Sequence, residues 1–128
     1  MGKFVVREVS SGYKFDLKAT NGQVVASSEV YKSKAGCLKG LESVRNNAPV
    51  ANLENQTIEG YEAAKNPKFE IYLDKADEYR FRLKAKNGEI IATSEGYTTM
   101  DSCKNGVESV RKNSENAEVV MPQLATAQ

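Results

Sequence analysis

The feature that most constrains this chain is an internal repeat. When the sequence is shifted by 66 positions, Tyr13–Asn47 aligns with Tyr79–Asn113 without a gap, and 18 of the 35 aligned residues are identical. Two copies of one small unit must obey the same local rules, so each structural prediction can be checked in both. A unit of this size buries little core alone, which favours two units that share one core.

Composition places the chain among ordinary globular proteins. Of its 128 residues, 40% are hydrophobic and 27% are charged, and the formal net charge is +1. This balance supplies little long-range attraction for nucleic acid or for a membrane surface. No apolar run is long enough to cross a bilayer, and the N-terminus lacks a signal-peptide pattern. We therefore expect a cytoplasmic protein without a membrane partner.

Two cysteines and the absence of histidine limit the chemistry. Histidine is the most frequent general base and metal ligand, so a chain without it is a poor candidate for an enzyme. Cys37 and Cys103 occupy equivalent positions in the two copies, which is typical of small buried hydrophobic side chains. We expect no catalytic residues, no metal site and no cofactor.

Alternating apolar and polar residues predict two strands at the start of each copy. The opening strands cover residues 4–9 and 69–73, and the clearest alternation follows over residues 13–20 and 79–86. A period of two places one face of each of these later strands in the core and the other face in water.

An Asn-Gly pair ends each alternating segment and predicts a β-hairpin. Asparagine and glycine both tolerate positive φ, which a two-residue type I′ turn requires at its central positions. Such a turn sets Leu17 opposite Ala26 and Ala19 opposite Val24. On the open face, the same register brings together opposite charges: Lys14 with Glu29, Arg80 with Glu95, and Lys86 with Glu89.

A change to helical spacing predicts a helix after each hairpin, with Ser33 and Thr99 as N-caps. A glycine recurs in the apolar stripe of both predicted helices, although glycine in a helix interior costs about 1 kcal/mol relative to alanine. This recurrence indicates a close approach of helix and sheet. The stripe positions follow i, i+3, i+4 and i+7: Cys37, Gly40, Leu41 and Val44, and Cys103, Gly106, Val107 and Val110.

The remaining segments predict a fourth strand in each copy and a linker between the copies. The strands are expected within residues 51–57 and 117–121, and the linker over residues 60–67, with a turn of helix over 62–65. The resulting division is residues 1–65 for repeat 1, 66–121 for repeat 2, both in one compact domain, and 122–128 for a flexible tail.

Three ordered motifs occur in both copies: Tyr-x-Phe-x-Leu-Lys-Ala-x-Asn-Gly, Ser-Glu-x-Tyr, and Gly-x-Glu-Ser-Val-Arg. In this order they resemble the YegP-like family of small bacterial proteins of unknown function. The resemblance implies an α+β fold of tandem β-β-β-α-β repeats with pseudo-two-fold symmetry. The repeats would form one antiparallel sheet, exchange their final strands and pack two helices on one face. It also implies a covalent pseudo-dimer, hence a monomer, and it transfers no catalytic residue.

A basic strip on the open face of the second hairpin is the first candidate binding surface. It consists of Arg80, Arg82, Lys84 and Lys86. Such a strip could follow a phosphate backbone while Tyr72 stacks on a base. The favoured alternative is a solvated sheet face whose charges already have carboxylate partners.

The second candidate surface lies at the end of each hairpin, where a glutamate and a tyrosine recur as Glu29 with Tyr31 and Glu95 with Tyr97. A carboxylate beside a phenol could bind a small polar ligand, and the repeat would then predict two such sites. The favoured alternative is that both tyrosines pack over the edge of the core with their hydroxyl groups in water.

Two further charge pairs recur at i, i+3 on the predicted helices, Glu42 with Arg45 and Glu108 with Arg111. Surface ion pairs explain them better than a binding surface. Taken together, the residues predict a small non-enzymatic binding or interaction module of unknown function, whose partner is a protein or a small polar ligand. A nucleic-acid binder that uses the basic strip is the alternative hypothesis, and an enzyme is the least favoured.

Overall fold

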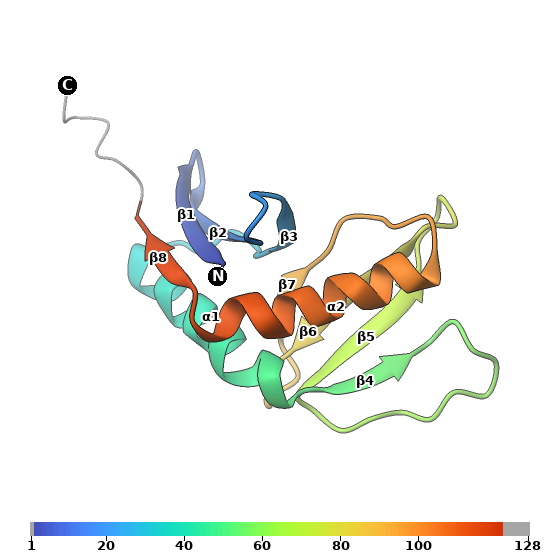
Figure 1. The fold of residues 1–128 in the computed structure, drawn as a ribbon. Coiled ribbons are helices and arrows are strands. Elements are labelled where there is room, and N and C mark those ends of the chain that lie inside the picture. Colours follow the sequence, from blue (N-terminus) through green and yellow to red (C-terminus); the bar gives the residue numbers. More distant parts are fainter. Residues whose placement is uncertain (1, 122–128) are drawn as a thin grey trace.

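A computed structural model describes residues 2–121 as one sheet with two helices packed on it (Figure 1). This arrangement confirms the predicted α+β class. The elements in chain order are β1 (Lys3–Val9), β2 (Gly12–Lys18), β3 (Val24–Ser27), α1 (Lys34–Asn47), η1 (Ala48–Val50), β4 (Asn52–Asn55), β5 (Lys68–Leu73), β6 (Tyr79–Lys84), β7 (Ile90–Thr93), α2 (Met100–Glu115) and β8 (Glu118–Val120).

The two repeats exchange their final strands, as the family resemblance implied. The strand order is β4-β5-β6-β7-β3-β2-β1-β8, so β4 of the first repeat joins the second and β8 of the second joins the first. Figure 1 shows the red strand β8 beside the blue strand β1. Both exchanged strands run parallel to their neighbours, and neither is joined to its neighbour by a tight hairpin turn, which would make the pair antiparallel. The sheet is therefore mixed, whereas the expected sheet was antiparallel throughout.

The two halves of the sheet meet at its centre, between β3 and β7. Their ladder contains one registered pair, Ser27 opposite Thr93. These two residues are equivalent under the 66-residue shift, so the pseudo-two-fold axis passes between them. The short seam means that helices and exchanged strands supply most of the contact between the repeats.

The hairpin turn differs from the predicted type I′ turn. The Gly22 N–H donates to the Ala19 carbonyl at 2.9 Å, and the Ala19 N–H donates to the Gln23 carbonyl at 2.9 Å. Gly22 has φ +84, while Asn21 does not have positive φ. These features describe a three-residue loop, in which a type I turn precedes a glycine bulge. Leu17 lies opposite Ala26 as predicted, but Val24 lies opposite Lys18 instead of Ala19.

Both helices begin at their predicted caps. Ser33 Oγ accepts a hydrogen bond from the Gly36 N–H, and Thr99 Oγ1 accepts one from the Ser102 N–H. The predicted stripe is buried in each helix. The two helices cover the same face of the sheet and touch each other, so the repeats share one core.

Aromatic residues from neighbouring strands form matching contacts in the two halves of that core. The rings of Phe4 and Phe15 meet edge to face with centroids 5.7 Å apart, and their counterparts Phe69 and Phe81 do so at 5.8 Å. Edge-to-face packing of this kind stabilises the fold beyond the gain from burying the ring surface alone. The two repeats therefore share the same aromatic contacts as well as the same secondary structure.

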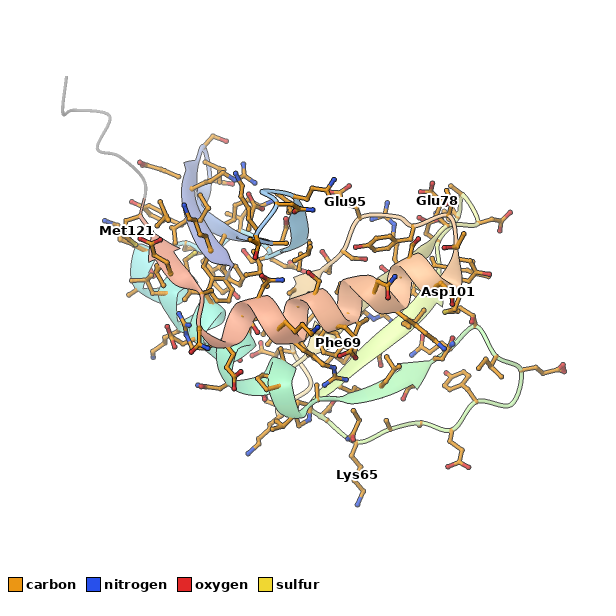
Figure 2. All side chains as sticks on the ribbon, in the orientation of Figure 1. Lys65, Phe69, Glu78, Glu95, Asp101 and Met121 are labelled. Atoms are coloured by element: carbon orange, nitrogen blue, oxygen red, sulfur yellow. The ribbon has the colours of Figure 1, made fainter. Side chains whose placement is uncertain are left out.

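Residues 56–67, which connect β4 to β5, run beside the edge strand β4 (Figure 1). The expected helical turn over residues 62–65 is wrong, because this segment contains no helical turn. It is held by Asn52 Nδ2, which donates to the Lys65 carbonyl at 2.8 Å, and by the Ala64 N–H, which donates to Glu54 at 2.7 Å. Figure 2 shows the Lys65 side chain directed away from the sheet. The predicted tail, residues 122–128, lies outside the described residues.

Candidate functional site

Tyr31 and Tyr97 lie beneath the helices and are partly buried. They are more enclosed than the predicted position at the edge of the core. Tyr31 exchanges backbone hydrogen bonds with Tyr13, and its ring stacks on Phe15 with centroids 6.3 Å apart. Its phenol reaches α1 at Gly40, where a Cβ would overlap the hydroxyl oxygen. Tyr97 meets Gly106 in the same way. The predicted close approach of helix and sheet is confirmed, and the tyrosine is the group that requires it.

Each tyrosine forms a wall of a surface cleft, and the hairpin turn of the other repeat closes it. We call these the Tyr31 cleft, of about 320 Å³, and the Tyr97 cleft, of about 250 Å³. The Tyr31 cleft is lined by Tyr31, Gly36, Lys39, Gly40 and Ser43 of repeat 1 and by Ala85, Asn87, Glu89 and Ile91 of repeat 2. The Tyr97 cleft is lined by Tyr97, Ser102, Asn105, Gly106 and Ser109 of repeat 2 and by Ala19, Asn21, Gln23 and Val25 of repeat 1.

The two clefts are equivalent position by position. Under the 66-residue shift, all nine lining residues of one cleft map onto the nine of the other. Both clefts need both repeats, since the helix and the hairpin turn come from different copies. A single repeat could build neither cleft without a second copy beside it.

Several polar groups face these clefts. No residue between 2 and 121 supplies a hydrogen bond to either tyrosine hydroxyl, so both are available to a ligand or to water. Burial, followed by the nearby Cys37 and Glu29, raises the pKa of Tyr31, and burial likewise raises the pKa of Tyr97. Both phenols therefore stay protonated at neutral pH and can donate a hydrogen bond.

The hairpin turns present their side chains in a fixed orientation. Asn87 Oδ1 accepts the Glu89 N–H at 3.0 Å, and Asn87 Nδ2 donates to the Glu89 carboxylate at 2.8 Å. Asn21 makes the corresponding contacts with Gln23. On the helix side, Ser43 Oγ accepts a hydrogen bond from Asn47 Nδ2 at 3.0 Å. The polar walls of the clefts are therefore largely preorganised.

Glu29 and Glu95, the predicted carboxylate partners of the tyrosines, are exposed and do not line the clefts. Figure 2 shows Glu95 on the connection between β7 and α2. The sequence analysis thus identified the tyrosines of the clefts and missed the residues from the opposite repeat. The glycine that recurs in the apolar stripe of each helix, Gly40 and Gly106, was the one signal that pointed toward this place.

The basic strip is partnered by carboxylates from β5 and from the turn that follows it. Arg82 Nε pairs with Glu70 at 2.6 Å, Lys84 Nζ pairs with Glu70 at 3.3 Å, and Arg80 Nε pairs with Asp74 at 2.6 Å. Asp74, and not the predicted Glu95, is thus the ion-pair partner of Arg80. Lys86 lies apart on the exposed turn.

Tyr72, which would stack on a base under the nucleic-acid hypothesis, already has a guanidinium over its ring. The guanidinium of Arg82 lies 4.5 Å from the centre of that ring. A base could stack there only by displacing a charged group that also pairs with Glu70. The open face of repeat 2 is a network of internal contacts, as the favoured alternative for this face expected, although its carboxylates come from β5 and the turn after it.

Two buried carboxylates anchor this network, and the sequence analysis did not single them out. Glu54 and Glu70 are 3% and 2% exposed. Lys68 Nζ lies 2.7 Å from Glu54 and 3.1 Å from Glu70. Burial alone would raise the pKa of Glu54, but hydrogen bonds from Gln56, Lys68 and the Ala64 N–H outweigh it and lower the pKa to about 2. Both carboxylates are therefore ionised ligands of the basic residues.

The recurring Glu-x-x-Arg pairs on the helices connect the two repeats. Arg45 Nη1 donates to the carbonyls of Ser114 and Glu115 at the end of α2, both at 3.2 Å. Arg111 Nη1 donates to the Ala48 carbonyl at 3.0 Å. Each guanidinium also lies over a core phenylalanine and pairs with the glutamate three residues before it. Folding therefore explains this repeated motif more fully than the predicted surface ion pair did.

The two cysteine thiols are the remaining groups that could carry chemistry, and both are buried. Cys37 and Cys103 are free and fully buried, which agrees with their predicted role as small core side chains. Burial raises the pKa of Cys37, and it raises that of Cys103 to about 11. Within residues 2–121, no three acidic, cysteine or histidine side chains gather as a metal site, and neither helix could span a membrane.

Comparison with known proteins identifies relatives that cover most of the chain. A family model described as a domain of unknown function (DUF1508) matches twice, over residues 9–54 and 74–120. The UPF0339 protein YegP of Yersinia pestis is 40% identical over 114 residues, which cover 88% of each chain. A UPF0339 protein of Treponema denticola is 58% identical over 53 residues, which cover 41% of this chain and 91% of that shorter protein.

A solved structure has the same fold. The solution NMR structure of a UPF0339 protein from Shewanella oneidensis superimposes with a TM-score of 0.77 at 31% identity, over 94% of this chain and 90% of that chain. The resemblance noted from the motifs is thereby confirmed. The short Treponema protein corresponds to one repeat, which agrees with a tandem origin of the longer chain.

Proposed function

The chain belongs to the DUF1508 family, whose description assigns no function, and on that premise we propose that it is a small non-enzymatic module that binds polar small molecules in the Tyr31 and Tyr97 clefts. The observation that carries this proposal is the equivalence of the clefts at all nine lining positions. Packing explains the tyrosine and the glycine. It does not require that polar groups from both repeats also converge beside the phenol.

The chemistry of the clefts favours binding over catalysis. Each contains a protonated phenol whose hydroxyl has no hydrogen-bond partner in the described part of the chain, and hydroxyl or amide groups are held in place around it. Raised tyrosine pKa values make Tyr31 and Tyr97 hydrogen-bond donors and poor bases. Cavities of this size lie at the small end of the range for ligand pockets, which suits a compact polar molecule.

The two clefts differ in charge, so we expect them to differ in ligand preference. The Tyr31 cleft contains Lys39 and Glu89, whereas the Tyr97 cleft has Asn105 and Gln23 at the equivalent positions. A molecule with a carboxylate and an ammonium group matches the first cleft, because each of its charges would meet the opposite one. A neutral amide or polyol matches the second.

The cellular setting and assembly are part of the same proposal. We infer a cytoplasmic monomer, because the exchanged strands and helices of the two repeats already satisfy each other within one chain. The half-length Treponema relative supports the interpretation of this chain as a covalent pseudo-dimer.

Nucleic-acid binding through the basic strip is the second and less favoured candidate. Lys86 lies on an exposed turn where it could contact a phosphate. The other three basic residues, Arg80, Arg82 and Lys84, would have to exchange their carboxylate partners for phosphates. The direct test is binding of short single-stranded DNA and RNA at low salt, where phosphate contacts are strongest. If neither oligonucleotide binds there, this candidate is excluded.

The main proposal is tested by an amide NMR titration with pooled polar metabolites that include the free amino acids and nucleosides. We expect shifts near Gly40 and Ala85 for one cleft, or near Gly106 and Ala19 for the other. Tyr31→Phe or Tyr97→Phe removes only the hydroxyl group and should weaken binding in its own cleft about fivefold, as expected for one neutral hydrogen bond.

Tyr61→Phe is the matched control, because Tyr61 is an exposed tyrosine outside both clefts. It should leave every affinity unchanged. A titration in which neither cleft responds to any pool would overturn the proposal and favour a protein partner or a structural role.

A further inference from the structure

The open faces of the two repeats carry the same lysines in different surroundings. In repeat 2, Lys68 on β5 lies opposite Lys84 on β6. The carboxylate of Glu70 lies between them, 3.1 Å from Lys68 Nζ and 3.3 Å from Lys84 Nζ. Like charges directly across a sheet destabilise it, so this carboxylate offsets their repulsion.

Repeat 1 retains the lysine pair and lacks the carboxylates. Lys3 on β1 lies opposite Lys18 on β2, in the register of Lys68 and Lys84. Val5 occupies the position of Glu70, and its neighbour Val120 on β8 occupies the position of Glu54. Where repeat 2 holds its buried carboxylates, repeat 1 has a cavity of about 440 Å³, lined by Lys3, Val5, Lys18, Ala19, Thr20, Gly22 and Val120.

Within residues 2–121, no carboxylate forms an ion pair with either lysine of this cavity. Asp16, the nearest buried carboxylate, is occupied by Arg7 Nε at 2.8 Å and by the Ser27 hydroxyl at 2.6 Å. Among residues 2–121, Lys3 and Lys18 form no ion pair. Glu118 lies opposite Lys3 on β8, but it does not line the cavity.

We propose that this cavity binds a small carboxylate with a short aliphatic chain. The carboxylate would lie between Lys3 and Lys18 as Glu70 lies between Lys68 and Lys84. The aliphatic chain of the ligand would cover Val5 and Val120, whose side chains are partly exposed. A doubly charged rim with an apolar floor favours an amphipathic anion over a purely hydrophilic one. The cavity shares Ala19 with the Tyr97 cleft, but its lysines and valines line neither tyrosine cleft. The proposal therefore does not depend on the function proposed for those clefts.

The experiment uses the full chain and hexanoate as the probe, followed by amide NMR. We expect saturable shifts at Lys3, Val5, Lys18 and Val120. Hexanol lacks the charge and inorganic phosphate lacks the chain, so both should bind at least about tenfold more weakly than hexanoate. If phosphate binds as tightly as hexanoate, the site is a general anion site and the assignment to aliphatic carboxylates is wrong.

Variants locate the binding. Lys18→Gln should weaken hexanoate binding about tenfold, the loss expected for one charge-assisted contact. Lys14→Gln removes the same charge from the same strand outside the cavity and should change the affinity less than twofold. Val5→Glu should abolish binding, because it supplies an internal carboxylate as repeat 2 does. Equal effects of Lys18→Gln and Lys14→Gln, or no saturable shift up to the solubility limit of hexanoate, would overturn the proposal.

Discussion

The phenol of Tyr31 packs against Gly40 of α1 so closely that a Cβ at position 40 would overlap its hydroxyl oxygen. The same contact joins Tyr97 and Gly106 in the second repeat, where the added Cβ would also meet Cε2 of Phe81 at 2.9 Å. A glycine that weakens a helix is thus retained in both copies by a side chain of the sheet beneath it. This contact also forms the wall of each cleft.

Replacement of these glycines should therefore destabilise the protein, although alanine favours a helix by about 1 kcal/mol. We expect Gly106→Ala to lower the free energy of unfolding, since overpacking a core costs about 1–3 kcal/mol. Gly40→Ala should have a smaller effect, because only the Tyr31 ring must move. Urea denaturation of both variants measures the difference, and a Gly106→Ala protein as stable as the wild type would contradict the packing described here.

Arg45 should contribute more to stability than its ion pair suggests. Its guanidinium donates hydrogen bonds to two carbonyls of the opposite repeat. It also pairs with Glu42 and lies over the ring of Phe4. Arg45→Lys retains the charge but loses the planar fork, so we expect the free energy of unfolding to fall by about 1–3 kcal/mol. Glu42→Gln removes only the exposed partner and should change it by less than about 1 kcal/mol. Chemical denaturation of the two variants side by side checks this order, and the reverse order would count against a link between repeats.

The buried carboxylates should make stability sensitive to acid. The pKa of Glu54 is lowered from 4.5 to about 2, so its contribution is complete above pH 4.5 and is lost as the pH falls toward 2. That contribution is on the order of 3 kcal/mol. Glu54→Gln should therefore lose less stability than the wild type between pH 4.5 and pH 2.

The measurement is urea denaturation across this pH range. Glu59→Gln is the control, because this substitution also removes one carboxylate and Glu59 is exposed. Its acid profile should follow that of the wild type. Parallel profiles for all three proteins would show that the Glu54 network does not contribute as described.

The local elements could be predicted from the sequence because short-range patterns determine them. Period-two alternation located β2 and β6, and the 3.6-residue stripe with its Ser33 and Thr99 caps located the helices. The turn type could not be predicted in the same way. An Asn-Gly pair satisfies a type I′ turn and also a type I turn with a glycine bulge, since both need positive φ at the glycine.

The candidate surfaces show a similar division. Arg80, Arg82 and Lys84 were correctly placed on the open face, but their partners Glu70 and Asp74 come from β5 and the turn after it, which no spacing within β6 reveals.

The repeat by itself determined that the chain has two matching strand-hairpin-helix units with buried stripes, because these depend on residues a few positions apart. Only the tertiary structure decided what the units make together. The exchange of β4 and β8 and the placement of Tyr31 and Ala85 in one cleft bring together residues far apart in sequence. The same exchange pairs Glu54 with Glu70 in one half and Val120 with Val5 in the other, so that equivalent lysine pairs lie in a carboxylate network in one half and beside a cavity in the other. Such contacts depend on how two units pack about an axis, and that geometry leaves no periodic signal in either copy.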